Sequence, residues 1–285
     1  MTPTDKRKRL RAILNGNELV SPATVFDALS ARVAESAGFE TGILSGSVSA
    51  ATVLAAPDLA LQTLSEFAAQ VRVVTRACDL SVFVDADQGY GNALNVMRTV
   101  EELEHAGLAG LAIEDLVMPH PFGVHGKDQL ISVPEMMGKL KAALAARRDP
   151  SLVLVARTAS LRIEPLDKVL ARVREYANSG VDGVFITGLA KLEDLEAIRG
   201  AVNIPIILGS AAGLKRADLA ARGVRFCLQG HAVLAAIAKA MHDTYTHFRN
   251  GGTADGLKPI LATPEEMARL IGKAEYERLS ENYLN

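Results

Sequence analysis

The chain has 285 residues, which is enough for one large domain or two small ones. Its 31 basic residues nearly balance 33 acidic residues, and this net charge of −2 excludes both a nucleic-acid-binding surface and an acidic solvating tail. Hydrophobic residues make up 49% of the chain, so we expect a sizeable core and exclude disorder over the whole chain.

Eight short apolar runs recur along the chain, and each ends at a polar residue or a turn. In chain order they are residues 23–26, 42–44, 82–84, 111–113, 152–156, 183–186, 205–208 and 225–228. They are apolar throughout rather than alternating, which is typical of parallel strands that are buried on both faces.

Amphipathic helical patterns lie between these runs. They cover Leu61–Ala77, Val96–Ala106, a segment from the capping box at Ser132 to about Arg147, and Pro165–Asn178. About eight strand–helix repeats predict an α/β fold of the (β/α)8 TIM-barrel type. An open, doubly wound sheet is the alternative, but no Gly-rich phosphate-binding motif follows the first strand.

The C-terminal segment follows a different pattern. We expect residues 1–250 to form the catalytic barrel and residues 251–285 to form a linker and a C-terminal helix. Glycines interrupt residues 251–256, and a second capping box at Thr263 predicts a helix to about Ser280. Such a helix can pack on its own barrel or cross to a neighbouring subunit as a domain swap, and the pattern favours neither.

The chain has two cysteines, Cys78 and Cys227, which are too few for a disulfide scaffold or a Cys-rich zinc site. Their apolar surroundings predict buried, reduced thiols. No apolar stretch follows the charged N-terminus, as a signal peptide requires, and no apolar run reaches the ~18 residues of a membrane span. We therefore expect a soluble cytoplasmic protein.

Three carboxylates follow neighbouring predicted strands, at the end of a barrel where active sites lie. Asp85 and Asp87 follow the third run, and Glu114 follows the fourth. Carboxylates at one point repel one another, and a divalent cation such as Mg²⁺, which prefers oxygen ligands, would relieve this repulsion. The alternative is that Asp85 and Asp87 cap the next helix while Glu114 pairs with a basic residue.

Other polar groups follow the remaining runs. Arg157 offers a rigid fork of donors to a carboxylate or an oxyanion, or else forms a salt bridge to the nearby acids. The turn Ser45-Gly46-Ser47 can hold an anion by its backbone N–H groups, or be a plain tight turn. His231 can exchange a proton near neutral pH, although a lone histidine is more often structural.

The loop after the fourth run contains His120 and His125 and several Gly and Pro residues. It is long, and it follows the acidic residues. We interpret it as a candidate lid over the substrate, with an ordinary surface loop as the alternative.

The chain resembles the isocitrate lyase and phosphoenolpyruvate mutase superfamily. The segments VFDALSARVAESAGFE, LSGSVSA, AAPDLALQTLSE, VDADQGYGNALNV, AIEDLVMP, VARTAS and GVDGVFITG carry this resemblance, which spans most of the chain. It implies a (β/α)8 barrel with Mg²⁺ or Mn²⁺ at the strand ends and a swapped C-terminal helix. It also implies a homotetramer built as a dimer of dimers. Members make or break C–C or P–C bonds beside a carboxylated carbonyl group, through an enolate.

The resemblance also implies roles for single residues. Asp85 would hold the metal most directly, Asp87 and Glu114 would act directly or through water, and Asp58 would lie near the same metal shell.

The substrate would be held by a second set of residues. Arg157 would bind the substrate carboxylate or the enolate oxygen, and Ser45, Gly46 and Ser47 would bind the substrate carboxylate. His231 would donate a hydrogen bond to the departing carboxylate.

Several differences narrow the choice within the superfamily. The lid segment Met118–Gly123 lacks the cysteine of isocitrate and methylisocitrate lyases and the Asn-Ser of phosphonopyruvate-forming mutases. Thr187-Gly188 stands where the lyases carry an acidic residue. The pattern is most similar to the oxaloacetate decarboxylase branch, from which Gln88 and Ala159 depart.

We therefore predict Mg²⁺-dependent decarboxylation of oxaloacetate, or a related 3-carboxylated 2-keto acid, to pyruvate and CO2. The metal and Arg157 would stabilise the enolate. We expect no nucleic-acid or membrane partner. Two alternatives remain open, namely another C–C or P–C lyase or mutase of the superfamily, and a catalytically weak relative that binds an α-keto acid or oxalate. Ala159 is the residue that favours the last alternative.

Overall fold

The computed structural model describes residues 1–124, 127–211 and 213–284, and an eight-stranded parallel sheet lies at its centre. The strands pair in chain order, from β1 to β8. Each strand lies at one of the eight apolar runs, so the strand prediction is confirmed. Their bounds are β1 Ala23–Thr24, β2 Thr41–Leu44, β3 Ser81–Asp85, β4 Gly110–Glu114, β5 Val153–Thr158, β6 Gly183–Ile186, β7 Ile206–Leu208 and β8 Val224–Cys227.

The sheet closes on itself through the residue segment that precedes β1. Val20 forms a parallel bridge with Phe226 of β8. The Val20 N–H donates to the Arg225 carbonyl oxygen at 2.9 Å, and the Cys227 N–H donates to the Val20 carbonyl oxygen at 3.0 Å. The closed order of eight parallel strands is that of a (β/α)8 barrel, and the open sheet considered as an alternative is excluded.

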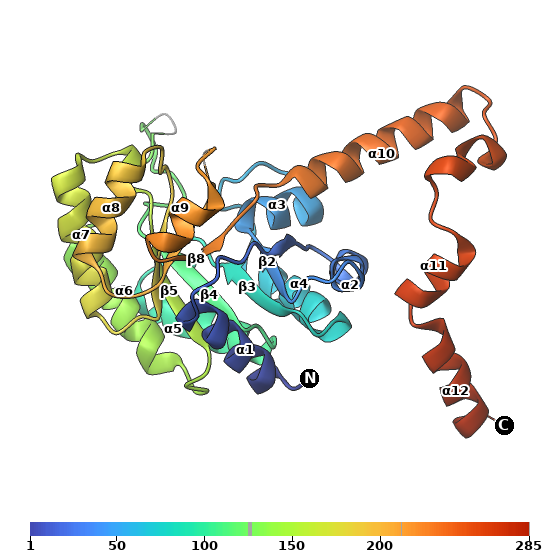
Figure 1. Cartoon of the computed structure of the whole chain (residues 1–285), viewed down its shortest axis with the longest axis horizontal. Coiled ribbons are helices and arrows are strands. Elements are labelled where there is room, and N and C mark those ends of the chain that lie inside the picture. Colours follow the sequence, from blue (N-terminus) through green and yellow to red (C-terminus); the bar gives the residue numbers. More distant parts are fainter. Residues whose placement is uncertain (125–126, 212, 285) are drawn as a thin grey trace.

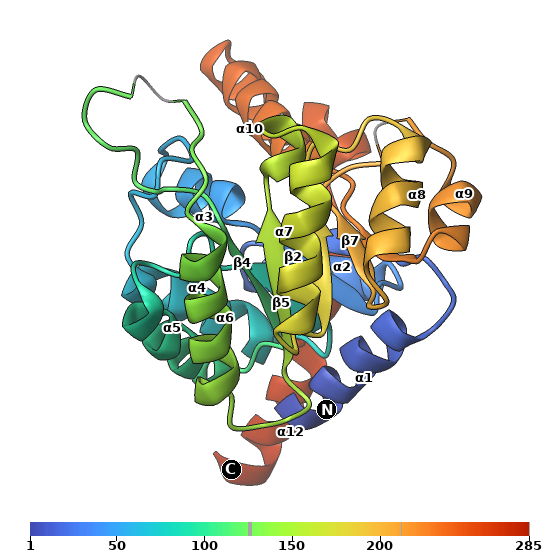
Figure 2. The same cartoon turned by 90° about the vertical axis from the view of Figure 1, so that its left-hand side faces the viewer.

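Helices cover the outer face of the barrel (Figures 1 and 2). All four predicted segments between strands are helical, with shifts of up to three residues at their ends. The surrounding helices are α2 Ala28–Ser36, α3 Gly46–Leu54, α4 Leu64–Ala77, α5 Ala93–His105, α6 Val133–Ala146, α7 Leu166–Asn178, α8 Leu192–Ala201 and α9 Arg216–Ala221, with a short 3-10 turn at Ser160–Arg162.

Helix α1, Pro3–Asn15, packs across the end of the barrel at which the strands begin. We did not predict this helix, because five of the six residues from position 6 to position 11 are basic and the segment therefore has no clear apolar pattern. Leu10 and Leu14 are nevertheless buried in one cluster with Phe83 and Phe226 of the barrel interior. Helix α1 therefore closes this end of the barrel. The opposite end, at which the strands terminate, is called the mouth below.

Helix α10, Ala232–Arg249, leaves the barrel and projects away from it (Figure 1). None of its residues is buried. A 3-10 segment, Ala254–Ile260, and the helices α11, Pro264–Leu270, and α12, Lys273–Tyr283, complete a C-terminal arm.

The prediction of one helix from Thr263 to Ser280 is wrong. Gly272, at φ +69°, separates α11 from α12, because a left-handed residue ends the helical hydrogen-bond pattern. At this break the Arg32 Nη1 atom of α2 donates to the Leu270 carbonyl oxygen at 3.0 Å. The arm thus returns to α2 of its own chain.

Both cysteines are buried and free, as predicted. Burial raises the pKa of the Cys78 thiol and of the Cys227 thiol, which keeps both protonated. Among the described residues, no helix has the length and apolar character that crossing a membrane requires.

Candidate active site

Three of the predicted site residues meet at the carboxyl ends of three adjacent strands. Asp85 ends β3, Glu114 ends β4, and Arg157 lies one residue before the end of β5, opposite Glu114 in the strand register. Arg157 donates through Nη1 to Asp85 Oδ2, and its Nη2 atom lies 3.1 Å from Glu114 Oε2. Asp85 and Glu114 are only 7% and 4% exposed. The guanidinium therefore joins two buried carboxylates across the mouth of the barrel.

This arrangement is the salt bridge that we considered as the alternative for Arg157. The guanidinium also lies over the Phe185 ring, with 5.4 Å between its central carbon and the ring centroid. Burial by itself lowers the pKa of Arg157, but the charges of Asp85 and Glu114 outweigh burial and raise it. Arg157 therefore stays charged and can offer its donors to an anionic substrate.

Asp87 lies in a tight turn that brings it back toward β4 and α3. Its φ is +46°, and Gly89, Tyr90 and Gly91 also have positive φ angles. The two glycines adopt such angles readily because they have no side chain. The Glu114 N–H donates to the Asp87 carbonyl oxygen at 2.8 Å. The turn thereby links the two acidic strand ends.

The carboxylate of Asp87 lies directly against Gly46. A Cβ atom built on Gly46 would be only 2.2 Å from Asp87 Oδ1, so no larger residue fits there without moving Asp87. The capping alternative for Asp85 and Asp87 is wrong, because Asn92 caps α5 and accepts hydrogen bonds from the Leu94 and Asn95 N–H groups.

The mouth of the barrel holds more acids than one guanidinium can neutralise. Burial, followed by the charges of Asp85 and Glu114, raises the pKa of Asp87 well above its usual range. Burial is also the largest cause that raises the pKa of Glu114 to about 7, with Arg157 opposing it and Asp85 adding to it. Burial and the charge of Asp85 raise the pKa of Asp58, which lies at the rim of the mouth. The site thus favours an additional positive charge.

The chemistry of these donors fits a hard divalent cation. Asp85 Oδ1 is buried and has no hydrogen-bond partner among the described residues, and all the acids offer oxygen ligands of the kind that Mg²⁺ prefers. The described part of the chain does not bring three such groups together as a finished set of ligands, and Arg157 lies between Asp85 and Glu114. An ion that bound there would share these carboxylates with Arg157.

The serine turn that follows β2 and the histidine that follows β8 also come together at the mouth. Ser45 is the N-cap of α3 and accepts a hydrogen bond from the Val48 N–H, so Ser45-Gly46-Ser47 opens a helix. Ser45 Oγ and Ser47 Oγ are 3.1 Å apart, and Ser47 Oγ lies 3.1 Å from His231 Nε2. Burial lowers the pKa of His231, and Asp58 and Asp85 oppose this effect. At pH 7 the imidazole is therefore mainly neutral.

All nine predicted site residues thus lie around the same mouth, but their contacts were not all predicted. The contact of Ser47 with His231 joins residues 184 positions apart, and no local pattern signals it. Phe185 under Arg157 and Tyr90 beside Asp87 were missed. The two glycines that flank Tyr90 are the one signal that marks it, because they indicate an unusual turn.

The candidate lid begins and ends at paired segments. Leu116 and Leu130 form an antiparallel bridge, and the Val117 N–H donates to the Gln129 carbonyl oxygen at 2.8 Å. From this base the loop projects beyond the barrel (Figure 2). His125, which we assigned to the lid, lies outside the described residues, and the role of the loop as a lid stays a prediction.

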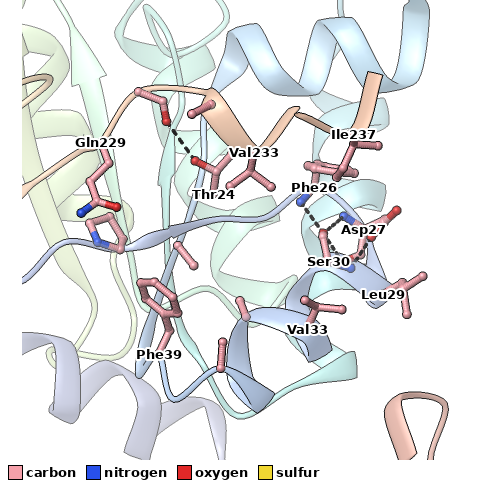
Figure 3. A pocket seen from close by; sticks show the side chains of 16 residues that line it. Thr24, Phe26, Asp27, Leu29, Ser30, Val33, Phe39, Gln229, Val233 and Ile237 are labelled. Carbon is pink, nitrogen blue, oxygen red and sulfur yellow. Dashed lines mark hydrogen bonds between the residues drawn. The ribbon is translucent and has the colours of Figure 1, made fainter. Parts of the chain in front are cut away.

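An apolar cavity of about 550 Å³ lies outside the mouth, between α2 and the start of α10. Figure 3 shows Leu29 and Val33 of α2 and Val233 and Ile237 of α10 around it, with Phe39 at its base. None of the predicted site residues lines it. The cavity is therefore separate from the cluster of acids.

Comparisons with known proteins agree with this geometry. The family model of phosphoenolpyruvate phosphomutase matches residues 10–249. The chain is 47% identical to an oxaloacetate decarboxylase of Bradyrhizobium sp. (strain BTAi1), over 100% of this chain and 99% of the relative. It is 50% identical to an oxaloacetate decarboxylase of Rhodopseudomonas palustris (strain BisB18), again over 100% and 99% of the two chains.

A solved structure is similar over its whole length as well. Phosphonopyruvate hydrolase in complex with oxalate and Mg²⁺ superimposes with a TM-score of 0.88 and 27% sequence identity, covering 100% of both chains. The likeness includes the C-terminal arm.

Proposed function

The chain belongs to the phosphoenolpyruvate phosphomutase family, and from this membership we propose that it is an oxaloacetate decarboxylase. The observation that carries this proposal is the full-length similarity to oxaloacetate decarboxylases. The buried group of Asp85, Glu114 and Arg157 supports it, because it provides both oxygen ligands for a cation and a donor for an anionic oxygen.

The proposed reaction breaks the bond between C3 and C4 of oxaloacetate. C4 leaves as CO2, the electron pair of the broken bond moves into the C2 carbonyl group, and the enolate of pyruvate results. A proton from water then adds to C3 and completes pyruvate. The negative charge that the site must stabilise therefore develops on the C2 oxygen.

Arg157 is the donor proposed for this oxygen. Its guanidinium is fixed between two carboxylates and over Phe185, so it does not need to reorganise as the charge develops. The loss of one such pre-aimed donor typically lowers the rate by about 10²–10³.

The remaining residues are proposed to hold the two carboxylates of the substrate. The backbone N–H groups and hydroxyls of Ser45, Gly46 and Ser47 stand at the N-terminus of α3, where an anion is favoured, and would bind the C1 carboxylate. His231, through the nitrogen that meets Ser47, would contact the C4 carboxylate until it leaves.

The proposed metal ligands are Asp85, Asp87 and Glu114, with Asp58 in the outer shell. Mg²⁺ or Mn²⁺, when bound, would polarise the keto and carboxylate oxygens of the substrate. The three carboxylates would hold the ion, the turn at Asp87 would bring its carboxylate toward Glu114, and Gly46 would leave room for it.

Release of pyruvate from oxaloacetate tests the proposal. We expect turnover above the spontaneous rate with Mg²⁺ and its loss with EDTA. Arg157→Lys should lower kcat by about 10²–10³, because lysine is a point charge without the planar fork. Arg98→Lys, at an exposed site on α5, is the matched control and should keep full activity. Turnover at the spontaneous rate, with oxalate raising Tm, would instead indicate a relative that binds α-keto acids without decarboxylating them.

We also propose that the C-terminal arm contacts a second copy of this chain through α10, within a homotetramer built as a dimer of dimers, while α11 lies against α2 of its own chain. Helix α10 buries none of its residues, although Val233, Met241 and Phe248 are large and apolar. Beside it lies the apolar cavity against α2 (Figure 3). A helix of a second copy would cover both surfaces. The division at residue 250 stays a prediction.

A further inference from the structure

A buried polar cluster lies directly behind the pair of Glu114 and Arg157. Glu114 and Arg157 are opposite one another in the register of β4 and β5, and Asp115 and Thr158 are the residues that follow them. Successive side chains of a strand point to opposite faces. Asp115 and Thr158 therefore face outward, toward α7, while Glu114 and Arg157 face the mouth.

The carboxylate of Asp115 is fully buried and accepts hydrogen bonds from two elements. The Thr158 Oγ1 atom donates to Asp115 Oδ2 at 2.6 Å, and the Ala159 N–H donates to Oδ1 at 3.2 Å. The hydroxyl of Tyr176 on α7 donates to Oδ2 at 2.8 Å. Asp115 thus joins the ends of β4 and β5 to each other and to α7.

Arg172 of α7 extends the cluster to the base of the loop that follows β4. Its Nη1 atom lies 3.5 Å from Asp115 Oδ2 and donates to the Tyr176 hydroxyl at 2.9 Å and to the Ile131 carbonyl oxygen at 3.1 Å. The Ile131 N–H in turn donates to the Asp115 carbonyl oxygen at 2.9 Å. The last residue of the loop is therefore fixed to the same carboxylate-bearing residue.

We propose that Asp115, Thr158 and Tyr176 are positioning residues that hold Arg157 opposite Glu114 for the decarboxylation. This inference rests on the proposed function. A buried carboxylate must keep its hydrogen bonds, because an unpaired one carries the full cost of removal from water. When a donor is lost, the strand ends move to recover a partner, and the residues one position earlier move with them. A misplacement of about 1 Å at reacting groups can lower a rate by about 10².

Thr158 offers the sharpest test, since it can be changed with little alteration of its shape. Thr158→Val removes the hydroxyl, and Thr158→Ser keeps it. Tyr176→Phe removes the other hydroxyl that donates to Asp115, the one on α7. The control is Thr75→Val, which removes another buried hydroxyl, one that donates to the Ala106 carbonyl oxygen away from the mouth.

Steady-state kinetics on oxaloacetate with Mg²⁺ and thermal unfolding are measured for all four variants. We expect Thr158→Val and Tyr176→Phe to lower kcat by about tenfold or more, with a smaller change in KM. Thr158→Ser should restore kcat to within about twofold. Thr75→Val should lower Tm similarly to Thr158→Val and leave kcat unchanged. If Thr158→Val or Tyr176→Phe lowers Tm but keeps kcat at the level of Thr75→Val, the cluster is only structural and the inference is wrong.

A second measurement separates this inference from the proposed function. The rise in Tm caused by Mg²⁺ with oxalate reports on the same residues without turnover. If the wild-type protein does not decarboxylate oxaloacetate, the proposed function fails, yet the inference still predicts a smaller rise in Thr158→Val than in Thr75→Val. Equal rises in these two variants would contradict the inference.

Discussion

At the scale of single residues, the mouth of the barrel is defined by its excess of negative charge. Four acids, Asp58, Asp85, Asp87 and Glu114, surround the guanidinium of Arg157. Burial and the charge of neighbouring acids raise the pKa values of Asp58, Asp87 and Glu114. Their repulsion is a cost in the protein alone and a source of affinity for a cation. The same residues that destabilise the fold therefore prepare the site, which is common where function and stability compete.

Stability should consequently depend on pH through Glu114. Its pKa is raised to about 7 in the folded protein, from an ordinary value of 4.5. Between these two values the folded state holds a proton that the unfolded state has released, so the free energy of unfolding falls as pH rises, by up to about 3 kcal/mol. Urea unfolding in EDTA from pH 4.5 to 7.5 measures this fall. Glu114→Gln, which cannot ionise, should reduce it, and an unchanged fall in that variant would contradict the assignment.

Gly46 should tolerate no side chain. In Gly46→Ala the new Cβ atom would meet the Asp87 carboxylate, so Asp87 must move away. We expect kcat/KM for oxaloacetate to fall by at least about tenfold while the barrel still folds. Gly138→Ala on α6 is the control, because a Cβ atom there meets nothing and alanine favours a helix. Equal activity of the two variants would show that the position of Asp87 is unimportant.

The sequence identifies the site residues better than their contacts. Asp85, Glu114 and Arg157 are recognisable because each ends an apolar run, and parallel strands bring such ends to one edge. The salt bridges between them depend on distances across the barrel. The order of residues along the chain gives no information about those distances. Ser47 and His231 meet because β2 pairs with β1 while β8 pairs with the segment that immediately precedes β1.

At the scale of elements, helix α1 combines a charged sequence with a buried position. Arg7 is 6% exposed, and it donates to the Leu108 and Glu104 carbonyl oxygens at 3.1 and 2.8 Å. It also pairs with Asp149 at 2.8 Å, and this contact helps to lower the pKa of Asp149, against the effect of burial. The basic residues of α1 thus satisfy carbonyl groups and acids at the closed end of the barrel.

Removal of Arg7 should therefore destabilise the protein without altering its chemistry. Arg7→Ala leaves Glu104 and Asp149 without their cation, and we expect a loss of about 3–5 kcal/mol in the free energy of unfolding. Lys8→Ala, at an exposed position on the same helix, should change it by less than about 0.5 kcal/mol. Urea unfolding of both variants measures the difference, and similar losses would show that α1 is only loosely attached.

The strands were easier to predict than the terminal helices, for a physical reason. An apolar run buried on both faces is visible in the sequence by itself, and all eight lie where expected. Helix α1 buries its apolar side chains in one narrow stripe, and several of its basic residues pair with carbonyl groups and acids. Its sequence therefore shows mostly polar residues. The break at Gly272 coincides with Arg32 of α2, a contact that the local sequence does not contain.

At the scale of the whole molecule, the projecting arm is the surface through which we propose that copies of the chain assemble. Its helix α10 has apolar residues that the described chain leaves open to solvent, and exposed patches of this kind mark interaction surfaces. The arm and the cavity beside α2 belong to one continuous region (Figures 1 and 3). The proposed assembly therefore depends on the apolar surface of this region.

Charge placed in this region should dissociate the assembly. Val233 and Ile237 both line the cavity, and the double change Val233→Lys with Ile237→Lys would bury two unpaired charges at the contact. We expect sedimentation velocity to show an oligomer for the wild-type protein and a monomer for this variant. Lys239→Ala, at an exposed site of the same helix, should remain oligomeric. A monomeric wild-type protein would contradict the proposed assembly.

The bridge between Val20 and Phe226 also has a consequence during synthesis. It joins residues about 200 positions apart by two backbone hydrogen bonds, next to a first strand of two residues. The ribosome delivers the chain from its N-terminus, so β1 to β7 emerge before the barrel can close. Until β8 is synthesised, the backbone groups at Val20 have no strand to pair with. The seam is thus the place where a nascent chain is most exposed to pairing with another, and where amide hydrogens of the finished barrel should exchange soonest.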